Sequence, residues 1–413
     1  MSKLQDLIDS LCPNGVEFKP LGEIATLSRG KVYSKEYLRD NPGTYPVYSS
    51  QTANDGVLGK IDSFDYDGEY LTWTTDGAYA GTIFHRKGKF SITNVCGLIT
   101  LNSNNIILRF LYYWLSIEAP KYVYTGMGNP KLMSNQVTPI LIPIPPLPVQ
   151  EEIVRILDRF SNYAAELQAE LQARKEQYEY YRNLLLTFNP SACGCGTDDK
   201  QKDNVIAPPS TTYKIQWKKM GEIGTFIRGN GLQKKDFTES GVGCIHYGQI
   251  YTHYGTSATK TKSFVDAVLA KNLLKVEKGD IVLACTSENI EDVAKAVAWL
   301  GEETIVTGGH SVVFKHNQVP KYIAYYFQTS LFFNQKKKYA YGAKVIDIKT
   351  EDLAKILIPV PPIEVQEKIV AILDRFETLV NDISKGLPAE IEAQKTRYEY
   401  YRNKLLTFKP LPA

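Results

Sequence analysis

The segment QYEYYRNLLLTF, at residues 177–188, returns as RYEYYRNKLLTF at residues 397–408, with ten of twelve positions identical. The match extends upstream, where IPIPPLPVQEEIVRILDRF at 142–160 resembles IPVPPIEVQEKIVAILDRF at 358–376. A weaker match joins FKPLGEIATLSRGK, from Phe18, to WKKMGEIGTFIRGN, from Trp217. Two copies with a period of roughly 200 residues indicate a duplication rather than a solenoid. We therefore expect a globular unit followed by a long helix, twice over.

Both repeated segments carry the apolar spacing of a coiled-coil helix. Val149, Ile153 and Ile156 begin a stripe with the alternating steps of four and three that define a heptad. The stripe continues to Phe188, and the second copy carries a similar stripe over residues 365–408. Each helix would be about 60 Å long at 1.5 Å per residue. The two stripes are comparable, so we expect the helices to pair. The alternative is that each helix covers only its own globular unit.

Proline, glycine and polar residues indicate where the chain divides. We expect globular units at residues 1–148 and 217–362, long spacer helices at 149–189 and 363–408, and a polar linker at 190–216. Gly386-Leu387-Pro388 predicts a kink in the second helix, because proline cannot donate a backbone hydrogen bond.

The globular units combine short β-rich runs with turns. These runs include TYPVYSS (44–50), EYLTWTT (69–75), GTIFHRKGKFSI (81–92), GCIHYGQIYTHYG (243–255), GDIVLACT (279–286) and HSVVFKHN (310–317). An amphipathic aromatic helix is expected in each unit, near 106–118 and 320–333. The predicted fold class is α/β or α+β, with a mostly antiparallel, twisted sheet in each unit.

Composition and motifs argue against several functional classes. The net charge of +3 is almost neutral, so any nucleic-acid binding would depend on local patches. No apolar run approaches the roughly 20 residues of a membrane helix, and the N-terminus has no signal-peptide pattern, so we expect a cytoplasmic protein. Cys193-Gly194-Cys195 is favoured as a loop over a zinc knuckle, and His310 as a turn residue over a base. We expect no catalytic residue, no metal site and no cofactor.

The remaining chemistry is that of a binding surface. The chain contains 27 tyrosines, and basic residues alternate with them in the loops, as in Arg29, Lys31, Tyr33 and Lys35. Lysine and arginine contact phosphates, whereas tyrosine, serine, threonine and asparagine reach base edges. Any single cluster of this kind is also explained by an ordinary solvated face.

With these features together, the chain resembles the specificity subunit of type I restriction–modification enzymes. The resemblance rests on PNGVEFKPLGEI (13–24), the two proline-rich junctions with their helices, HYGQIYT (246–252) and TSENIED (286–292). It covers nearly all of the chain, in order. It implies two target-recognition domains, each reading half of a split, asymmetric site in double-stranded DNA. It also implies an antiparallel coiled coil that sets the gap and docks two modification (methyltransferase) subunits, which are joined by motor–nuclease restriction subunits.

The resemblance also implies where DNA is bound, by region rather than by residue, because base-contacting residues vary within the family. The regions follow Arg29 and Arg228, span 74–79 and 286–295, and span 126–131 and 342–349. The residues expected to bind DNA are Arg29, Lys31, Tyr33, Lys35, Thr74, Thr75, Tyr79, Asn129, Lys131, Arg228, Lys234, Lys235, Tyr247, Thr286, Ser287, Asn289, Lys336, Lys337, Lys338 and Lys344.

Three alternatives remain open at this stage. The first is that the chain is a standalone nuclease or methyltransferase. The second is a coiled-coil scaffold without affinity for DNA, and the third is the specificity part of a system that methylates but lacks the motor subunit. The first is disfavoured because no cofactor loop or carboxylate constellation is present in the sequence.

Overall fold

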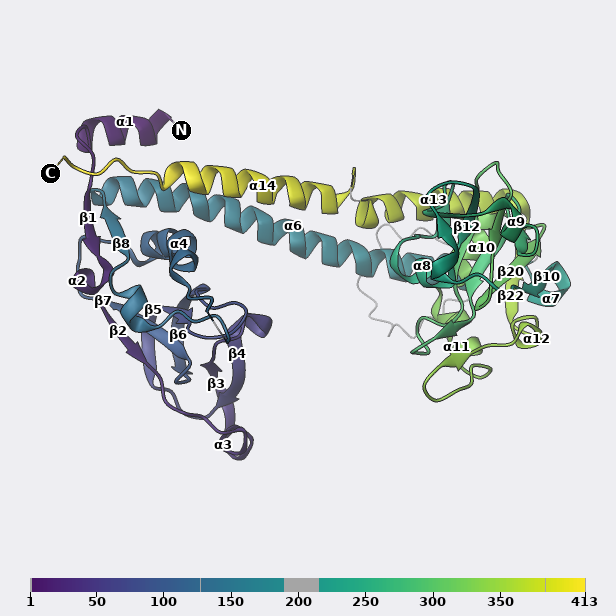
Figure 1. The fold of residues 1–413 in the computed structure, drawn as a ribbon, viewed down its shortest axis with the longest axis horizontal. Coiled ribbons are helices and arrows are strands. Elements are labelled where there is room, and N and C mark those ends of the chain that lie inside the picture. Colours follow the sequence, from purple (N-terminus) through teal and green to yellow (C-terminus); the bar gives the residue numbers. More distant parts are fainter. Residues whose placement is uncertain (1, 127, 189–214, 383, 413) are drawn as a thin grey trace. The chain divides into compact units, whose positions relative to one another are not determined.

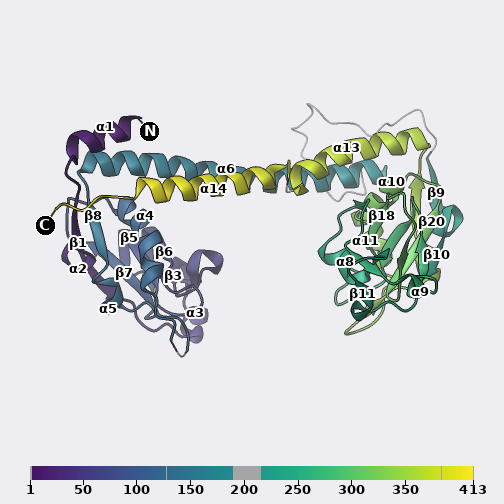
Figure 2. The ribbon, with the colours of Figure 1, turned by 45° about the horizontal axis from the view of Figure 1, so that its top comes forward.

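The computed structural model describes residues 2–126, 128–188, 215–382 and 384–412. The chain forms two compact units (Figures 1 and 2). Unit 1 comprises Met1–Gln168 and Ile391–Ala413, and unit 2 comprises Ala169–Glu390. Most of the predicted linker, with Cys193-Gly194-Cys195, lies outside the described residues. None of the described helices has the length and apolar character of a membrane span.

A six-stranded sheet forms the body of unit 1. Its order is β2-β7-β5-β6-β3-β4, and every neighbouring pair is antiparallel except β3 and β6. The end of the central strand β5 is buried on both faces, which suits its aromatic and β-branched residues Leu71 to Thr74. The strands are β2 (Ala25–Arg29), β3 (Pro42–Tyr48), β4 (Val57–Ile61), β5 (Tyr66–Thr74), β6 (Ile83–Ile92) and β7 (Cys96–Leu101).

The core of unit 1 lies between this sheet and the helix α4 (Leu108–Glu118). Phe110, Leu111 and Tyr113 of α4 are fully buried, and they pack in one cluster with Val149 and Ile153 of α6 (Leu147–Thr187). A short ladder of β1 (Glu17–Pro20) with β8 (Leu141–Ile144) brings the start of the unit beside the start of α6. The smaller helices are α1 (Ser2–Leu11), α2 (Leu21–Ile24), α3 (Lys35–Asp40), η1 (Ala53–Gly56), η2 (Ala119–Tyr122) and α5 (Ser134–Val137).

The end of the chain completes this core. Leu405 and Leu406 are buried in the same cluster, and the ring of Phe408 lies 6.1 Å from that of Phe110. The backbone N–H of Val16 donates to the carbonyl of Lys409 over 2.8 Å. Unit 1 is therefore built from two stretches that are far apart in the sequence.

Unit 2 contains two five-stranded sheets. The first, in the order β10-β20-β16-β18-β13, corresponds to the sheet of unit 1, and the second has the order β11-β14-β12-β19-β15. The strands are β10 (Gly224–Arg228), β11 (Phe237–Thr238), β12 (Val242–Ile245), β13 (Ser257–Ala258), β14 (Ser263–Val265), β15 (Leu274–Val276), β16 (Ile281–Ala284), β18 (Lys295–Trp299), β19 (Ile305–Thr307) and β20 (Ser311–His316). Short pairs join β9 (Gln216–Lys219) to β22 (Leu357–Val360) and β17 (Thr286–Ser287) to β21 (Ile346–Asp347).

The core of unit 2 repeats the arrangement of unit 1. Tyr322, Tyr325 and Tyr326 of α10 (Pro320–Tyr326) are fully buried against the sheet and against Ile369 of α13 (Ile363–Asn381). The predicted class, with duplicated units and mostly antiparallel sheets, is confirmed. The remaining helices are α7 (Met220–Ile223), η4 (Lys234–Asp236), α8 (Tyr247–Thr252), α9 (Ala267–Ala270), α11 (Ser330–Lys336), α12 (Thr350–Leu353) and α14 (Leu387–Leu405).

One predicted β-rich run is wrong in part. Residues 243–255 give β12 and then the helix α8. The Nδ1 atom of His246 accepts from the N–H of Gly248 over 3.2 Å, and the side chain of Gln249 accepts from the N–H of His246. This reciprocal cap starts a helix in a segment whose aromatic residues favour a strand.

The long helices pair within each unit. In unit 1, Phe160 of α6 stacks on Tyr401 of α14, with ring centroids 5.4 Å apart, and the later residue Tyr163 lines one groove with the earlier residue Gln394. The pairing is therefore antiparallel, and Figure 2 shows α6 and α14 side by side. In unit 2, Tyr181 of α6 stacks on Phe376 of α13 in the same way, at 5.5 Å.

One long helix with a kink was expected for residues 363–408. The structure has two separate helices there. They are α13, which ends at Asn381, and α14, which begins at Leu387. The carboxylate of Asp382 accepts from the N–H and the hydroxyl of Ser384, which competes with helical hydrogen bonding. Pro388 lies in the first turn of α14, where a missing N–H costs least.

Candidate nucleic-acid interface

Three loops of unit 1 meet at one edge of its sheet. β2 ends at Arg29 opposite Gly97, and β5 ends at Thr74 opposite Cys96, so both strands finish at the edge where β7 begins. The third loop joins them there, because the N–H of Leu132 donates to the carbonyl of Thr75 over 3.0 Å. The regions predicted after Arg29, at 74–79 and at 126–131 are thus neighbours in space.

Unit 2 gathers its corresponding loops in the same way. Arg228 at the end of β10 lies opposite Val312, and Ala284 at the end of β16 lies opposite Ser311. The β17–β21 pair then joins the 286–295 loop to the 342–349 loop. The two units therefore present equivalent edges, each formed by loops that are distant in the sequence.

Several predicted residues of unit 1 are exposed at or beside this edge. The Nη2 atom of Arg29 lies 3.5 Å from the sulfur of Met133, and Tyr79 is 65% exposed. The ammonium of Lys31 forms an ion pair with Asp65 at 2.7 Å, and the hydroxyl of Tyr33 donates to the same carboxylate. Lys35, Asn129 and Lys131 are also exposed.

Thr74 and Thr75 do not fit the prediction of direct DNA contact. Both are buried, and their hydroxyls donate to the backbone carbonyls of Tyr79 and Val95, over 2.5 and 2.7 Å. Thr286, which follows β16 in unit 2, is buried in the same way. These threonines hold the loops at the sheet edge, so a base edge cannot reach them in this conformation.

The predicted residues of unit 2 divide into exposed and paired side chains. Arg228 makes a two-pronged ion pair with Asp347, at 2.6 and 3.1 Å, and this carboxylate raises the pKa of Arg228. Asn289 donates to Asp292 within its own loop, and Tyr247 lies half-buried between the rings of His246 and His310. Ser287 is half-exposed, and the exposed lysines are Lys234, Lys235, Lys337, Lys338 and Lys344.

Lys336 was predicted to contact phosphate with its two neighbours, and the structure contradicts this. Its side chain is buried, and its ammonium donates to the carbonyls of Glu291 and Val293 over 2.7 and 2.6 Å. Burial lowers the pKa of Lys336 to about 8. The helix α11 turns this residue inward and leaves Lys337 and Lys338 outside.

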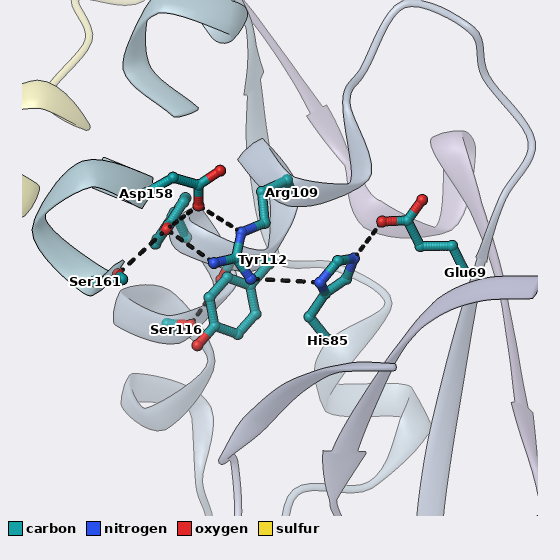
Figure 3. A network of polar contacts seen from close by, with 8 residues as sticks. Glu69, His85, Arg109, Tyr112, Ser116, Asp158 and Ser161 are labelled. Atoms are coloured by element: carbon teal, nitrogen blue, oxygen red, sulfur yellow. Dashed lines mark hydrogen bonds and ion pairs between the residues drawn. The ribbon is translucent and has the colours of Figure 1, made fainter. Parts of the chain in front are cut away.

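A polar network connects the sheet of unit 1 to its spacer helix (Figure 3). Asp158 of α6 accepts from the Nε of Arg109 at 2.8 Å and from the hydroxyl of Tyr113 at 2.6 Å. Arg109 also contacts His85 of β6 at 3.4 Å, and His85 lies 2.7 Å from the carboxylate of Glu69. Burial and the adjacent carboxylate raise the pKa of Tyr113.

Unit 2 repeats this anchor with related residues. The hydroxyl of Tyr325 donates to Asp374 over 2.6 Å. Lys321 corresponds to Arg109, and its ammonium lies 2.5 Å from the carboxylate of Asp374. These anchors were not predicted from the sequence. The signal was the aspartate of LDRF, which recurs at Asp158 and Asp374.

A buried glutamine provides a second anchor in each unit. Gln150 donates to the carbonyls of Asn105 and Pro145, and its own carbonyl accepts from the N–H of Ile107 at 2.8 Å. In unit 2, the side chain of Gln366 donates to the carbonyl of Pro361 and accepts from the N–H of Val319. Each spacer segment is therefore fixed to its globular part by the same two side-chain types.

The described residues contain no cluster of three or more histidine, cysteine, aspartate or glutamate side chains that could hold a metal ion.

The sequence of the chain matches a known protein family. The family model for the type I restriction modification DNA specificity domain matches residues 13–177 and again residues 214–393. The chain belongs to this family. The two matches cover most of the sequence and correspond to the two copies of the repeat.

Relatives in this specificity-domain family match either one copy or the whole chain. The specificity subunit of EcoR124I/EcoR124II from Escherichia coli is 29% identical over 99% of this chain and 97% of its own length. The putative specificity subunit S.MpnORF507P of Mycoplasma pneumoniae is 27% identical over 93% and 95%. A further M. pneumoniae protein, S.MpnORF365P, is 43% identical over 40% of this chain, a match that spans 63% of that protein.

Solved structures share the fold of the chain. The type I restriction-modification S subunit from M. genitalium aligns with a TM-score of 0.52 and 15% identity over 96% of this chain and 97% of its own. A chain from a structural study of type I R-M complex assembly and conformational transition aligns with a TM-score of 0.57 and 17% identity, over 95% and 98%.

Proposed function

We propose that the chain is the DNA-reading subunit of a type I restriction–modification complex, in which each unit reads one half of a bipartite, asymmetric site. The observation that carries this proposal is the repetition of the loop-bearing edge. Both units bring three distant loops to the equivalent end of a sheet, and each unit is tied to its spacer helix by a buried glutamine and an aspartate.

The chemistry of the edges fits DNA rather than a small ligand. Arg29, Lys131 and Tyr79 are exposed in unit 1, and Lys234, Lys235 and Asn289 are exposed in unit 2. Such side chains contact phosphates or base edges, and they can do so although the whole chain carries a charge of only +3. Unlike the buried threonines, these side chains are exposed to solvent.

The paired helices have a different role in this proposal. They set the gap between the half-sites and dock two modification subunits, which carry the methyltransferase activity, and motor–nuclease subunits join afterwards. In unit 1 the coiled coil bears a groove of about 460 Å³ whose lining combines arginines with apolar and aromatic side chains. The lining residues are Arg155, Ile156, Arg159, Phe160, Tyr163, Gln394 and Tyr401. Mixed aromatic and arginine surfaces are typical of protein interfaces.

The chain itself is not catalytic in this account. Its residues recognise DNA, and the chemistry belongs to its partners, so the chain needs no cofactor of its own. Because its proposed ligand is genomic DNA, we place it in the cytoplasm.

The test is an exchange of one recognition region. Residues 18–140 are replaced by the corresponding region of another family member, and the methylated motif is mapped in cells that also express the modification subunit. One half of the motif should change while the other half stays the same. The matched exchange of residues 217–356 should change the opposite half. If either exchange alters both halves, the units do not read DNA separately and the proposal fails.

A further inference from the structure

The buried ammonium of Lys336 suggests a role that its exposed neighbours cannot share. We propose that Lys336 is a positioning residue that fixes the backbone of the 286–295 loop from its buried side. Reading of the second half-site would then depend on Lys336 although its side chain does not contact DNA. The inference rests on the proposed function for its effect on DNA reading, but the contact itself is independent of that function. The side chain is 4% exposed, and its ammonium donates to the carbonyls of Glu291 and Val293.

The loop has an internal structure that these two hydrogen bonds complete. Asn289 and Asp292 bond to each other through side chain and backbone, and the N–H of Ala294 donates to the carbonyl of Ala284 over 2.8 Å. Ala294 has a φ of +65°, a conformation that costs free energy for a residue with a Cβ. A strained turn persists only where its surroundings hold it. Lys336 supplies two bonds on the inner side of this turn.

A lysine suits this position better than other residue types. An ammonium has three donors and no acceptor, so it can satisfy two carbonyls at once. Lys336 is the last residue of α11, where the helix dipole favours a cation, and its ammonium lies 5.4 Å from the ring centre of Phe333. Because burial lowers the pKa only to about 8, the charged form predominates at neutral pH. Hydrogen bonds from a charged donor are roughly twice as strong as neutral ones.

Unit 1 holds its corresponding loop by a different device. Gly81 has a φ of +86°, and a Cβ at this position would lie 2.9 Å from Val123, just after η2. The 74–82 loop therefore packs directly on the neighbouring segment through a glycine, without a lysine. Removal of the Lys336 ammonium should consequently affect unit 2 alone.

The experiment compares Lys336→Met with the matched variants Lys337→Met and Lys338→Met in the full chain. Methionine is an unbranched side chain one heavy atom shorter than lysine, so it keeps most of the packing and removes the donors. Backbone hydrogen exchange over residues 286–295, which include the amides of Asp292, Ala294 and Lys295, should be roughly tenfold faster or more in Lys336→Met, because two charge-assisted hydrogen bonds are lost. The control variants should exchange at the wild-type rate, as should residues 74–82 in all three. Unchanged exchange in Lys336→Met would overturn the inference.

The effect on DNA is measured with the same variants in complex with the modification subunits. Lys336→Met should weaken discrimination at the second half-site about tenfold or more and leave the first half-site unchanged. It should not change the slope of binding against salt, whereas a phosphate contact would lower that slope by about one. A lower slope for Lys336→Met would refute the positioning role. If wild-type complexes recognise no bipartite site, the proposed function fails, while the exchange result still decides whether Lys336 holds the loop.

A measurement on the wild-type chain covers the case in which Lys336→Met does not fold. Acylation of the free chain with an amine-reactive acetyl ester should modify Lys337 and Lys338 readily and Lys336 at least about tenfold more slowly, because a buried, hydrogen-bonded amine is inaccessible. If Lys336 reacts as fast as its neighbours in the free chain, the residue is not buried in solution and the inference is wrong.

Discussion

Insertion of four residues into α6 offers a direct test of the proposed spacer. The segment AELQAELQ, residues 165–172, is a tandem repeat within this unbroken helix. Leu167 is buried, and Leu171 packs on the core of unit 2, so the leucine of each copy lies on the apolar seam. A third AELQ after Gln172 should keep the helix intact, because all four residues are good helix formers.

The magnitude follows from helix geometry. Four residues add about 6 Å at 1.5 Å per residue, and DNA advances about 3.4 Å per base pair. The unread gap between half-sites should therefore grow by one or two base pairs. The half-sites should not change, since no recognition loop is altered.

The assay is methylation mapping in cells that express the insertion variant with its modification subunit. Glu166→Gln is the matched control, since Glu166 is an exposed residue of the same repeat and the substitution preserves helix length. The control should retain the wild-type gap. A variant with the inserted AELQ that is fully active and keeps the wild-type gap would show that α6 does not set the spacing.

Three further substitutions test separate parts of the account. Replacement of Lys337 and Lys338 together by alanine should weaken binding to all DNA sequences alike, and it should lower the slope of log binding constant against log salt concentration by up to about two. An unchanged slope would mean that both lysines are ordinary solvent-exposed residues without phosphate contacts. Leu406→Ala should destabilise unit 1 by about 3 kcal/mol in denaturant unfolding, because it removes a buried side chain contributed by the end of the chain; a loss below about 1 kcal/mol would mean that the C-terminal segment does not complete the core. Glu152 is buried, and its hydrogen bonds from Arg155 and Lys3 lower its pKa from 4.5 to about 2. A depressed carboxyl pKa stabilises the folded state above pH 4.5 and less as the pH falls towards 2, so Glu152→Gln should be less stable than wild type at pH 7 and approach it in acid; a difference that does not depend on pH would contradict this.

The architecture was largely predictable because the two copies of the repeat could be compared with each other within one sequence. Heptad spacing predicted the long helices, and alternating runs predicted the central strands, such as β5 at Tyr66–Thr74. Local caps could not be read in the same way. The imidazole of His246 starts α8 by accepting a backbone hydrogen bond, a role that histidine seldom takes at this position. Asp382 similarly ends α13 through its bonds to Ser384.

The candidate interface was predictable by region but not by side chain. Strands that flank a common antiparallel neighbour end at the same edge of a sheet, and the loops after Arg29 and Arg228 lie beside the other predicted loops of their units in this way. Their contact with DNA stays a prediction. The direction of each side chain depends on tertiary contacts. Lys336, Lys337 and Lys338 are consecutive and chemically identical, yet only Lys336 is turned towards backbone carbonyls. Thr74 and Thr286 resemble base-reading residues in composition but are buried where their strands end.

The central claim is that this chain specifies a bipartite DNA site, and mapping of methylated adenines tests it most directly. The chain is expressed with its modification subunit in cells that lack other adenine methylation, and the modified sequences are determined genome-wide. The account predicts one motif made of two specific halves separated by a gap of fixed length and unspecified sequence. A single continuous motif, or methylation without sequence preference, would contradict it.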